Sequence, residues 1–321
     1  MGSAQGGPSS RETPNASAIL IDTGSRASGD WRFDPGKFKL WAMATPTLSK
    51  TTVPGALGPL FVDVRSANRH EPGPAVIVLH GFKGFKDWGM FPAFAERLAR
   101  AGFTAVSFNL SGSGVDDAGQ GAFPERFGHN TFATELRDLD TVLAALDAGQ
   151  LGVVRPSSVG IMGHSRGGGM AILWAAARTR VKALVTWAAI ATVRRWTTDQ
   201  CRTWRAAGRL DIVNVRTQEL LPLYPDTLDE IEALGGTTLD IEAAAARVAV
   251  PWLLAHGSAD EAVPLAEAHR LVQAARPGMV EPLIIEAAGH TFGATHPLTQ
   301  LSPHLDHLFT ASIAHLSRAL T

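Results

Sequence analysis

The chain has 321 residues, 45% of them hydrophobic and 18% charged, which suffices for a large core and excludes a compositionally disordered protein. Its 29 Lys and Arg residues are offset by 30 Asp and Glu residues, so it lacks the positive surplus that tight binding to nucleic acid or an anionic membrane needs. The single cysteine, Cys201, excludes an internal disulfide and a CxxC site, and no apolar run approaches the roughly 20 residues of a membrane helix. We therefore expect a soluble, cytoplasmic protein with neither nucleic acid nor membrane as a partner.

The first 50 residues differ in composition from the rest of the chain. They are rich in Gly, Ser, Pro and Thr and show no sustained hydrophobic period. They also lack the apolar segment of about 7 to 15 residues that a secretory signal contains. We expect residues 1–50 to be a flexible N-terminal tail or leader.

From Leu60 onward, short apolar runs alternate with longer segments of helical period, which is typical of a parallel sheet with helices on both faces. The predicted strands are Leu60–Arg65, Ala75–Leu79, Ala105–Asn109, Val159–Gly163, Ala183–Ala189, Trp252–His256 and Pro282–Glu286. The predicted helices are Trp88–Ala101, Thr131–Asp147, Gly168–Thr179, Leu265–Ala275 and Leu305–Ala319. For the first helix, Asp87 is the expected N-cap and Gly102 the expected stop. The fold class is therefore α/β.

One segment, residues 194–250, interrupts this alternation between two predicted core strands. It contains Trp196, Trp204, a strand-like stretch at Asp211–Val215 and a Pro-rich, acidic stretch around Tyr224. Compact domains rarely hold unstructured loops longer than about 15 residues. We expect an inserted cap or lid on a core made of residues 51–193 and 251–321, with a long disordered loop as the alternative.

The strongest chemical signal is Gly163-His164-Ser165-Arg166-Gly167, which follows a β-branched run and precedes a helix rich in small residues. This is the G-x-S-x-G pattern in a strand–turn–helix context. The serine occupies a strained turn, and the flanking glycines let the strand and helix backbones approach each other. We therefore predict Ser165 as the nucleophile.

A serine nucleophile needs a histidine base and a carboxylate that orients the histidine. Asp260 follows the strand that ends at His256, and His290 follows the next predicted strand. The order Ser, Asp, His is the order of α/β-hydrolases. Two rivals lie nearby, Glu261 for the acid and His296 for the base, but neither is placed as directly at a strand exit.

The developing oxyanion needs hydrogen-bond donors. The backbone N–H of Arg166, directly after the nucleophile, is one candidate. The turn His80-Gly81-Phe82-Lys83-Gly84 follows a strand, and the N–H of Phe82 is the second candidate. For His80 and His164 we favour structural roles.

Four short segments together carry a family resemblance: His80-Gly81-Phe82, Gly163 to Gly168, Gly257 to Asp260 with Val263-Pro264, and Gly289-His290-Thr291-Phe292. They resemble the dienelactone-hydrolase-like group of α/β-hydrolases, and most closely its serine esterases, including bacterial cinnamoyl and feruloyl esterases. The resemblance covers about Pro54 to Leu320 and implies the α/β-hydrolase fold, a mostly parallel sheet with helices on both faces and a lid over the acyl pocket at residues 194–250. One departure is that dienelactone hydrolases use a cysteine nucleophile, so dienelactone hydrolysis is not expected here.

We expect a serine carboxylesterase that forms an acyl-enzyme on small to medium apolar or aromatic acyl esters, with Trp187, Trp196, Trp204 and Tyr224 as candidate pocket walls. A small-molecule ester is the expected partner. No metal or organic cofactor is expected, and the sequence leaves the oligomeric state open, a homodimer included. The alternatives are a serine peptidase of the prolyl-oligopeptidase type, although no propeller repeat fits the first seventy residues, and a non-catalytic binding module of the same fold. Nucleotide binding is disfavoured because Ser111-Gly112-Ser113-Gly114 lacks the G-x-G-x-x-G spacing.

Overall fold

The computed structural model describes residues 2, 45–214 and 219–321. Apart from Gly2, all of them belong to one compact unit, Lys39–Thr321. Within the described ranges no helix is both long enough and apolar enough to cross a bilayer.

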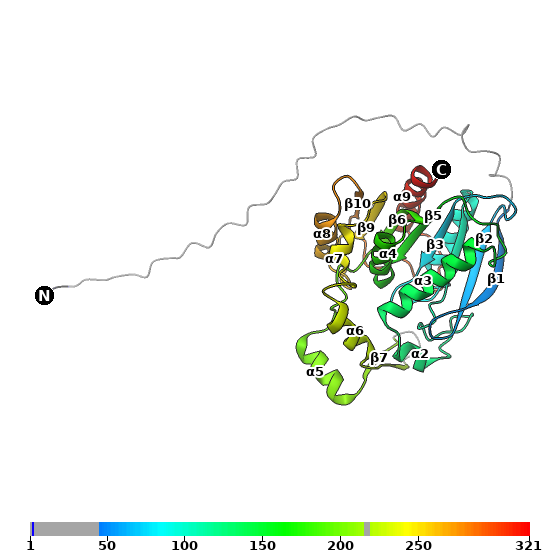
Figure 1. Ribbon diagram of the computed structural model, residues 1–321. Coiled ribbons are helices and arrows are strands. Elements are labelled where there is room, and N and C mark those ends of the chain that lie inside the picture. Colours follow the sequence, from blue (N-terminus) through cyan, green and yellow to red (C-terminus); the bar gives the residue numbers. More distant parts are fainter. Residues whose placement is uncertain (1, 3–44, 215–218) are drawn as a thin grey trace. The chain divides into compact units, whose positions relative to one another are not determined.

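An eight-stranded sheet with the order β1-β2-β4-β3-β5-β6-β9-β10 forms the centre of this unit (Figure 1). Its strands are β1 (Thr47–Pro54), β2 (Pro59–Ser66), β3 (Ala75–Leu79), β4 (Thr104–Phe108), β5 (Val159–His164), β6 (Val181–Trp187), β9 (Trp252–Gly257) and β10 (Val280–Ile285). The pairs β1–β2 and β2–β4 are antiparallel, and every pair from β4 to β10 is parallel. The mostly parallel α/β architecture expected from the sequence is confirmed.

Helices cover both faces of the sheet. Side chains alternate between the two faces along each strand, and because the inner strands are apolar on both sides, each face has to be buried. In β3, Val76 and Val78 belong to the core on one face, whereas Ile77 and Leu79 belong to the core on the other. The first face packs against α1 (Met90–Arg100) and α9 (Pro303–Leu320). The second face packs against α3 (Phe132–Asp147), α4 (Arg166–Ala177) and α8 (Leu265–Ala274).

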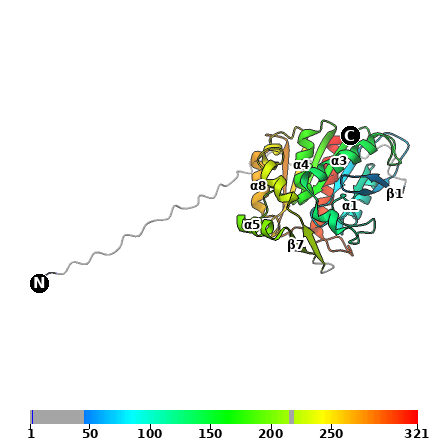
Figure 2. The same ribbon diagram turned by 60° about the horizontal axis from the view of Figure 1, so that its bottom comes forward.

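Residues 194–250 contain regular structure both before and after residues 215–218, which lie outside the described part. The elements are α5 (Thr198–Ala207), β7 (Leu210–Val213), β8 (Leu220–Leu223), α6 (Asp226–Leu234) and α7 (Ile241–Ala245), and β7 and β8 form an antiparallel pair. Figure 1 shows α5, α6 and β7 below the sheet, and Figure 2 brings this end of the molecule forward. Trp204, Leu223 and Leu228 from this segment form a small core with Phe127 of α2 (Pro124–Gly128). The expected strand at Asp211–Val215 corresponds to β7, although Val215 lies outside the described residues.

The element boundaries differ from the sequence expectations at two places that matter. Strand β1 was not predicted, and it places residues 47–50 of the expected tail in the sheet; residues 3–44 lie outside the described part. Its pattern is weak because it is an edge strand with mostly exposed polar side chains. The prediction of Asp87 as an N-cap is wrong, since α1 begins at Met90 and the Asp87 carboxylate instead lies 2.6 Å from Lys86 Nζ.

The inserted segment is joined to the core at the start of α3. Two backbone N–H groups there, those of Phe132 and Ala133, donate to the carboxylate of Glu230 in α6 at 2.6 and 2.9 Å. The first N–H groups of a helix have no partner within the helix, and the positive end of the helix dipole favours an anion there. Glu230 therefore acts as an N-terminal cap that comes from a different part of the chain.

We predict that Glu230→Ala lowers the free energy of unfolding by about 1 to 2 kcal/mol, because two N–H groups lose their acceptor. Glu230→Gln is expected to lose less, since it keeps an acceptor oxygen and removes only the charge. Urea denaturation measures both, with Glu71→Ala, an exposed loop position, as the control. Equal stability of Glu230→Ala and the control would contradict this role.

Candidate active site

Ser165 lies on a tight turn between β5 and α4. Its φ of 58° is in the left-handed region that non-glycine residues seldom adopt. A Cβ atom on Gly163 would lie 2.2 Å from the carbonyl oxygen of Gly167, and one on Gly167 would lie 2.3 Å from that of His80. Side chains at these two positions are therefore excluded, and the close contact of strand, helix and β3 loop forces the Ser165 side chain out of the sheet.

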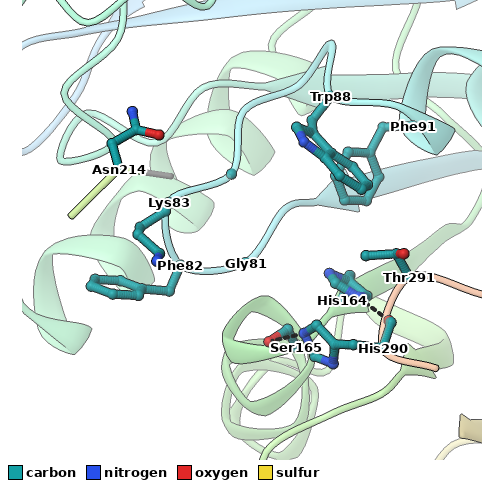
Figure 3. A pocket seen from close by; sticks show the side chains of 11 residues that line it. Gly81, Phe82, Lys83, Trp88, Phe91, His164, Ser165, Asn214, His290 and Thr291 are labelled. Carbon is teal, nitrogen blue, oxygen red and sulfur yellow. Dashed lines mark hydrogen bonds between the residues drawn. The ribbon is translucent and has the colours of Figure 1, made fainter. Parts of the chain in front are cut away.

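The structure brings Ser165, His290 and Asp260 together, although they come from three separate loops. His290 Nε2 lies 3.0 Å from Ser165 Oγ (Figure 3), and His290 Nδ1 lies 2.8 Å from Asp260 Oδ2. Because a carboxylate only accepts, Nδ1 carries the proton, and Nε2 is left to accept the proton of the serine hydroxyl. This is the hydrogen-bond chain that a Ser-His-Asp triad requires.

Asp260 is held in its ionised form by its surroundings. Its Oδ1 accepts the backbone N–H groups of Ala262 and Val263, each at 2.9 Å. Burial on its own raises the pKa of Asp260, but hydrogen bonds from His290 and the Val263 N–H, together with attraction to His290 and His256, outweigh burial and hold the pKa below its usual value. A charged acid therefore faces His290 at neutral pH.

The segments that carry the two candidate oxyanion donors lie against Ser165. A Cβ atom on Gly81 would be 2.9 Å from Ser165 Cβ and 3.5 Å from the nitrogen of Arg166, so the loop that carries Phe82 passes directly against the elbow. Arg166 is the first residue of α4, and the N–H groups of a first helical turn lack partners within the helix. The positive end of that helix dipole adds to the attraction of a negative oxygen.

A cavity of about 250 Å³ opens beside Ser165. It is lined by Gly81, Phe82, Lys83, Gly84, Trp88, Phe91, His164, Ser165, Asn214, His290 and Thr291. Figure 3 shows two groups of side chains on opposite sides, with Trp88 and Phe91 on the side of His164 and Thr291, and Phe82 and Lys83 on the side of Asn214. Of the described residues in the inserted segment, Asn214 lines this cavity.

The structure does not place the four predicted pocket walls around this cavity. Trp187 is fully buried on the α1/α9 face, where it packs against Phe94 and Phe309 and donates to Ser312 Oγ. The prediction that Trp187 is a pocket wall is wrong. Strand β6 lies inside the sheet, and Trp187, its last residue, has its side chain buried in the core. Trp196 and Trp204 pack edge to face in the small core of the insert, and Tyr224 stacks on His129.

Sequence reasoning missed Lys83, Trp88, Phe91 and Asn214. Trp88 lies just before α1 and Phe91 lies in its first turn, both shortly after the turn that carries Phe82. The ends of parallel strands are where ligands bind in open α/β sheets, so this position after β3 was a usable signal. Of the rival residues, His296 accepts the N–H of Gly89 at 3.0 Å through its Nδ1, and Glu261 is exposed. Across the described ranges, no group of three or more His, Cys, Asp or Glu side chains is placed to hold a metal ion.

A family model described as serine aminopeptidase, S33, matches residues 70–293. This range covers more than half of the chain and includes Ser165, Asp260 and His290. The chain belongs to this family of α/β-hydrolases. Its membership, and the fold it shares with the structures below, confirm the resemblance to α/β-hydrolases that the motifs indicated.

Several known hydrolases resemble this family member. The 2,6-dihydropseudooxynicotine hydrolase of Paenarthrobacter nicotinovorans is 25% identical over 238 residues, which are 71% of this chain and 56% of that protein, so the chain spans little more than half of that relative. Est1E of Butyrivibrio proteoclasticus with ferulic acid bound is 20% identical, with a TM-score of 0.63 over 81% of this chain and 95% of its own. Dienelactone hydrolase of Anabaena variabilis ATCC 29413 is 17% identical, with a TM-score of 0.58 over 86% of this chain and 100% of its own. At these identities the two structures show a shared fold.

The side chain of Arg166 joins neighbouring parts of the structure. Its guanidinium is buried, lies 3.8 Å from the centroid of the Phe132 ring and 5.6 Å from that of Phe82, and its Nε is 2.9 Å from the Glu135 carboxylate. Burial raises the pKa of Glu135, and attraction to Arg166 offsets only part of this effect. The residue after the nucleophile thus connects α3 and Phe82 to the elbow.

His80 and His164 are buried and neutral in this α/β-hydrolase. His80 Nδ1 lies 2.9 Å from the Gly81 carbonyl and its Nε2 accepts the N–H of Leu110, so the ring carries one proton. Burial lowers the pKa of His80 to about 4, and the hydrogen bond with the Gly81 carbonyl offsets part of this effect. For His164, burial and, to a smaller extent, repulsion from His290 lower the pKa to about 3. Both groups therefore stay uncharged at the pH of most assays.

We predict that the free energy of unfolding falls as the pH decreases from about 6.5 to about 4. Both folded-state pKa values are depressed, so in this window the unfolded chain takes up a proton at each histidine while the folded chain does not, and the imbalance favours unfolding. Urea denaturation at a series of pH values measures the slope of the unfolding free energy against pH. His80→Gln should lower this slope, at the pH where it is steepest, by the contribution of about one proton. An unchanged slope in His80→Gln is the opposing result.

Proposed function

We propose that this α/β-hydrolase is a serine carboxylesterase that acts on small to medium apolar or aromatic acyl esters. The observation that carries the proposal is the hydrogen-bond chain from Ser165 Oγ through His290 to Asp260, with distances of 3.0 and 2.8 Å. A small-molecule ester is the proposed partner, and a cytoplasmic location stays a prediction.

The chemistry follows from this arrangement. His290 takes the proton of Ser165 as the oxygen attacks the ester carbonyl, and Asp260 stabilises the imidazolium that forms. The N–H groups of Phe82 and Arg166 donate to the oxyanion of the tetrahedral intermediate. His290 then protonates the leaving alcohol, and a water molecule, activated by the same base, hydrolyses the acyl-enzyme.

The cavity supports a small, partly aromatic substrate without a positive charge. A volume of about 250 Å³ is slightly below the roughly 300 to 1,000 Å³ of most ligand cavities, which favours a small substrate. Phe82, Trp88 and Phe91 provide aromatic surface. Est1E binds ferulic acid, an aromatic carboxylic acid, on the same fold.

Peptidase activity is the weaker candidate, although the family description names an aminopeptidase. An aminopeptidase has to hold the charged amino group of its substrate, for which a carboxylate is the natural partner. Among the described residues that line the cavity none is an Asp or Glu, and Lys83 adds a positive charge that repels an ammonium group. A non-catalytic binding module is disfavoured because all three triad side chains are present in bonding geometry.

We predict that Ser165→Ala folds normally and loses esterase activity by a factor on the order of 10³ to 10⁶, together with covalent labelling by a fluorophosphonate. His290→Ala should be about as damaging, and the double variant scarcely worse, because the two side chains act as one unit. The exposed Ser157→Ala is the matched control. Activity of Ser165→Ala close to that of the control would remove Ser165 as the nucleophile.

The substrate class is tested by kcat/KM values for p-nitrophenyl esters of increasing acyl length, methyl ferulate and an aminoacyl anilide. We predict that the esters are hydrolysed and that the anilide is not, because its ammonium group meets no carboxylate in the cavity. Faster cleavage of the anilide than of every ester would favour the peptidase.

A further inference from the structure

His164, the residue before the nucleophile, makes a direct contact with the backbone of the candidate base. It is the last residue of β5, and its Nε2 lies 3.0 Å from the carbonyl oxygen of His290 (Figure 3). A carbonyl oxygen can only accept, so the His164 Nε2–H donates. This hydrogen bond joins the end of β5 to the loop of His290, 126 residues further along the chain.

Packing fixes the His164 ring from two sides. The ring centroid is 4.7 Å from that of His290 and 6.0 Å from that of Phe91, in α1. Only 7% of the residue is exposed. The ring therefore has little freedom to turn away from the His290 carbonyl.

The loop that carries His290 is tied to the acid loop by other contacts. The N–H of Ala287 donates to Ser258 Oγ at 2.9 Å, and the N–H of Ala259 donates to the carbonyl of Ala288 at 3.0 Å. These bonds fix the base relative to Asp260. The bond from His164 fixes the base relative to Ser165, because His164 and Ser165 are adjacent in the chain.

The separation of base and nucleophile has to be held closely, since a shift of about 1 Å in an active site reduces the rate by as much as roughly 100-fold. We propose that His164 is a positioning residue, which holds the His290 carbonyl and thereby sets the reach of His290 Nε2 to Ser165 Oγ. The proposal rests on the proposed function, in which these two side chains are base and nucleophile.

A neutral ring suits this task. The titratable groups that face His164 are His290, Asp260 and His256, and α1 contributes the uncharged Phe91. Burial, followed by repulsion from His290, lowers the pKa of His164, while the His290 carbonyl and Asp260 offset part of this. His164 therefore adds no second positive charge when His290 becomes an imidazolium during the reaction.

The test compares three substitutions with different abilities to make the bond. Gln places an amide N–H near the position of Nε2, Phe keeps the planar volume without a donor, and Asn is polar but too short to reach the carbonyl. The measurements are the second-order rate of fluorophosphonate labelling, kcat and KM for p-nitrophenyl acetate, the pH profile of kcat/KM and the thermal midpoint. His315→Phe, at a buried histidine on α9 away from the cavity, is the matched control.

We expect His164→Phe and His164→Asn to lower both the labelling rate and kcat by about 10- to 100-fold while KM changes little. His164→Gln should recover most of the loss. The acidic limb of the pH profile should stay in place in all three variants, because the residue removed carries no charge there. His315→Phe should label at the wild-type rate even if its thermal midpoint falls.

Three results would overturn the proposal. One is wild-type labelling in both His164→Phe and His164→Asn, which would leave only a packing role. Another is a His164→Gln variant as slow as the Phe variant, and the third is a rise in KM at unchanged kcat. A wild-type protein that is not labelled at all would count against the proposed function and this proposal together, whereas a labelled wild type with equally fast variants counts against this proposal alone.

Discussion

The close approach of three backbone segments around Ser165 is the constraint on which the candidate active site depends. The end of β5, the start of α4 and the loop after β3 meet where Gly163, Gly167 and Gly81 have no side chains, and a Cβ atom at any of them would lie less than 3 Å from a neighbouring atom. This contact forces the left-handed conformation of Ser165 and lifts its hydroxyl out of the sheet. It also brings the loop that carries Phe82 against Ser165 and the backbone nitrogen of Arg166, so the same packing sets the candidate nucleophile and the segments that carry the candidate oxyanion donors.

Backbone strain is concentrated at the same edge of the sheet. Five described non-glycine residues have a positive φ, and all of them lie in the loops after β3, β5, β6 and β10. They are Lys83, Ser165, Ala188, Ala287 and Phe292. Such conformations cost about 1 to 3 kcal/mol each and persist only where the surrounding structure holds them. Here the surroundings are a core packed on both faces of the sheet and a network of buried hydrogen bonds.

Near the site, the buried cations Lys86 and Arg166 each lie against a carboxylate, and the buried His80 and His164 are neutral, which limits the cost of placing these groups there. Lys86, four residues after Phe82, has a fully buried side chain with its Nζ 3.0 Å from Asp63 and 3.1 Å from Asp117. Burial on its own lowers the pKa of Lys86, but hydrogen bonds to Asp87 and Asp63 outweigh it and raise the pKa. The loop that carries Phe82 is thereby joined to β2, while His80 and His164 stay uncharged inside the protein.

The sequence by itself determined the α/β class, the elbow at Ser165 and the candidates Asp260 and His290, because these depend on local patterns: apolar alternation, glycine spacing and the ends of strands. Those signals lie within a few residues of each feature, so a linear reading can find them. The walls of the cavity were decided only by the tertiary structure. Trp187 points into the core and Trp88 lines the cavity, although both indoles lie on the same face of the sheet. Nothing local in the sequence distinguishes them, since the difference depends on the helices α1 and α9, which cover Trp187 with Phe94 and Phe309. The contact of His164 with His290 and that of Glu230 with α3 join segments about 100 residues or more apart, and such pairs form only when the core has packed.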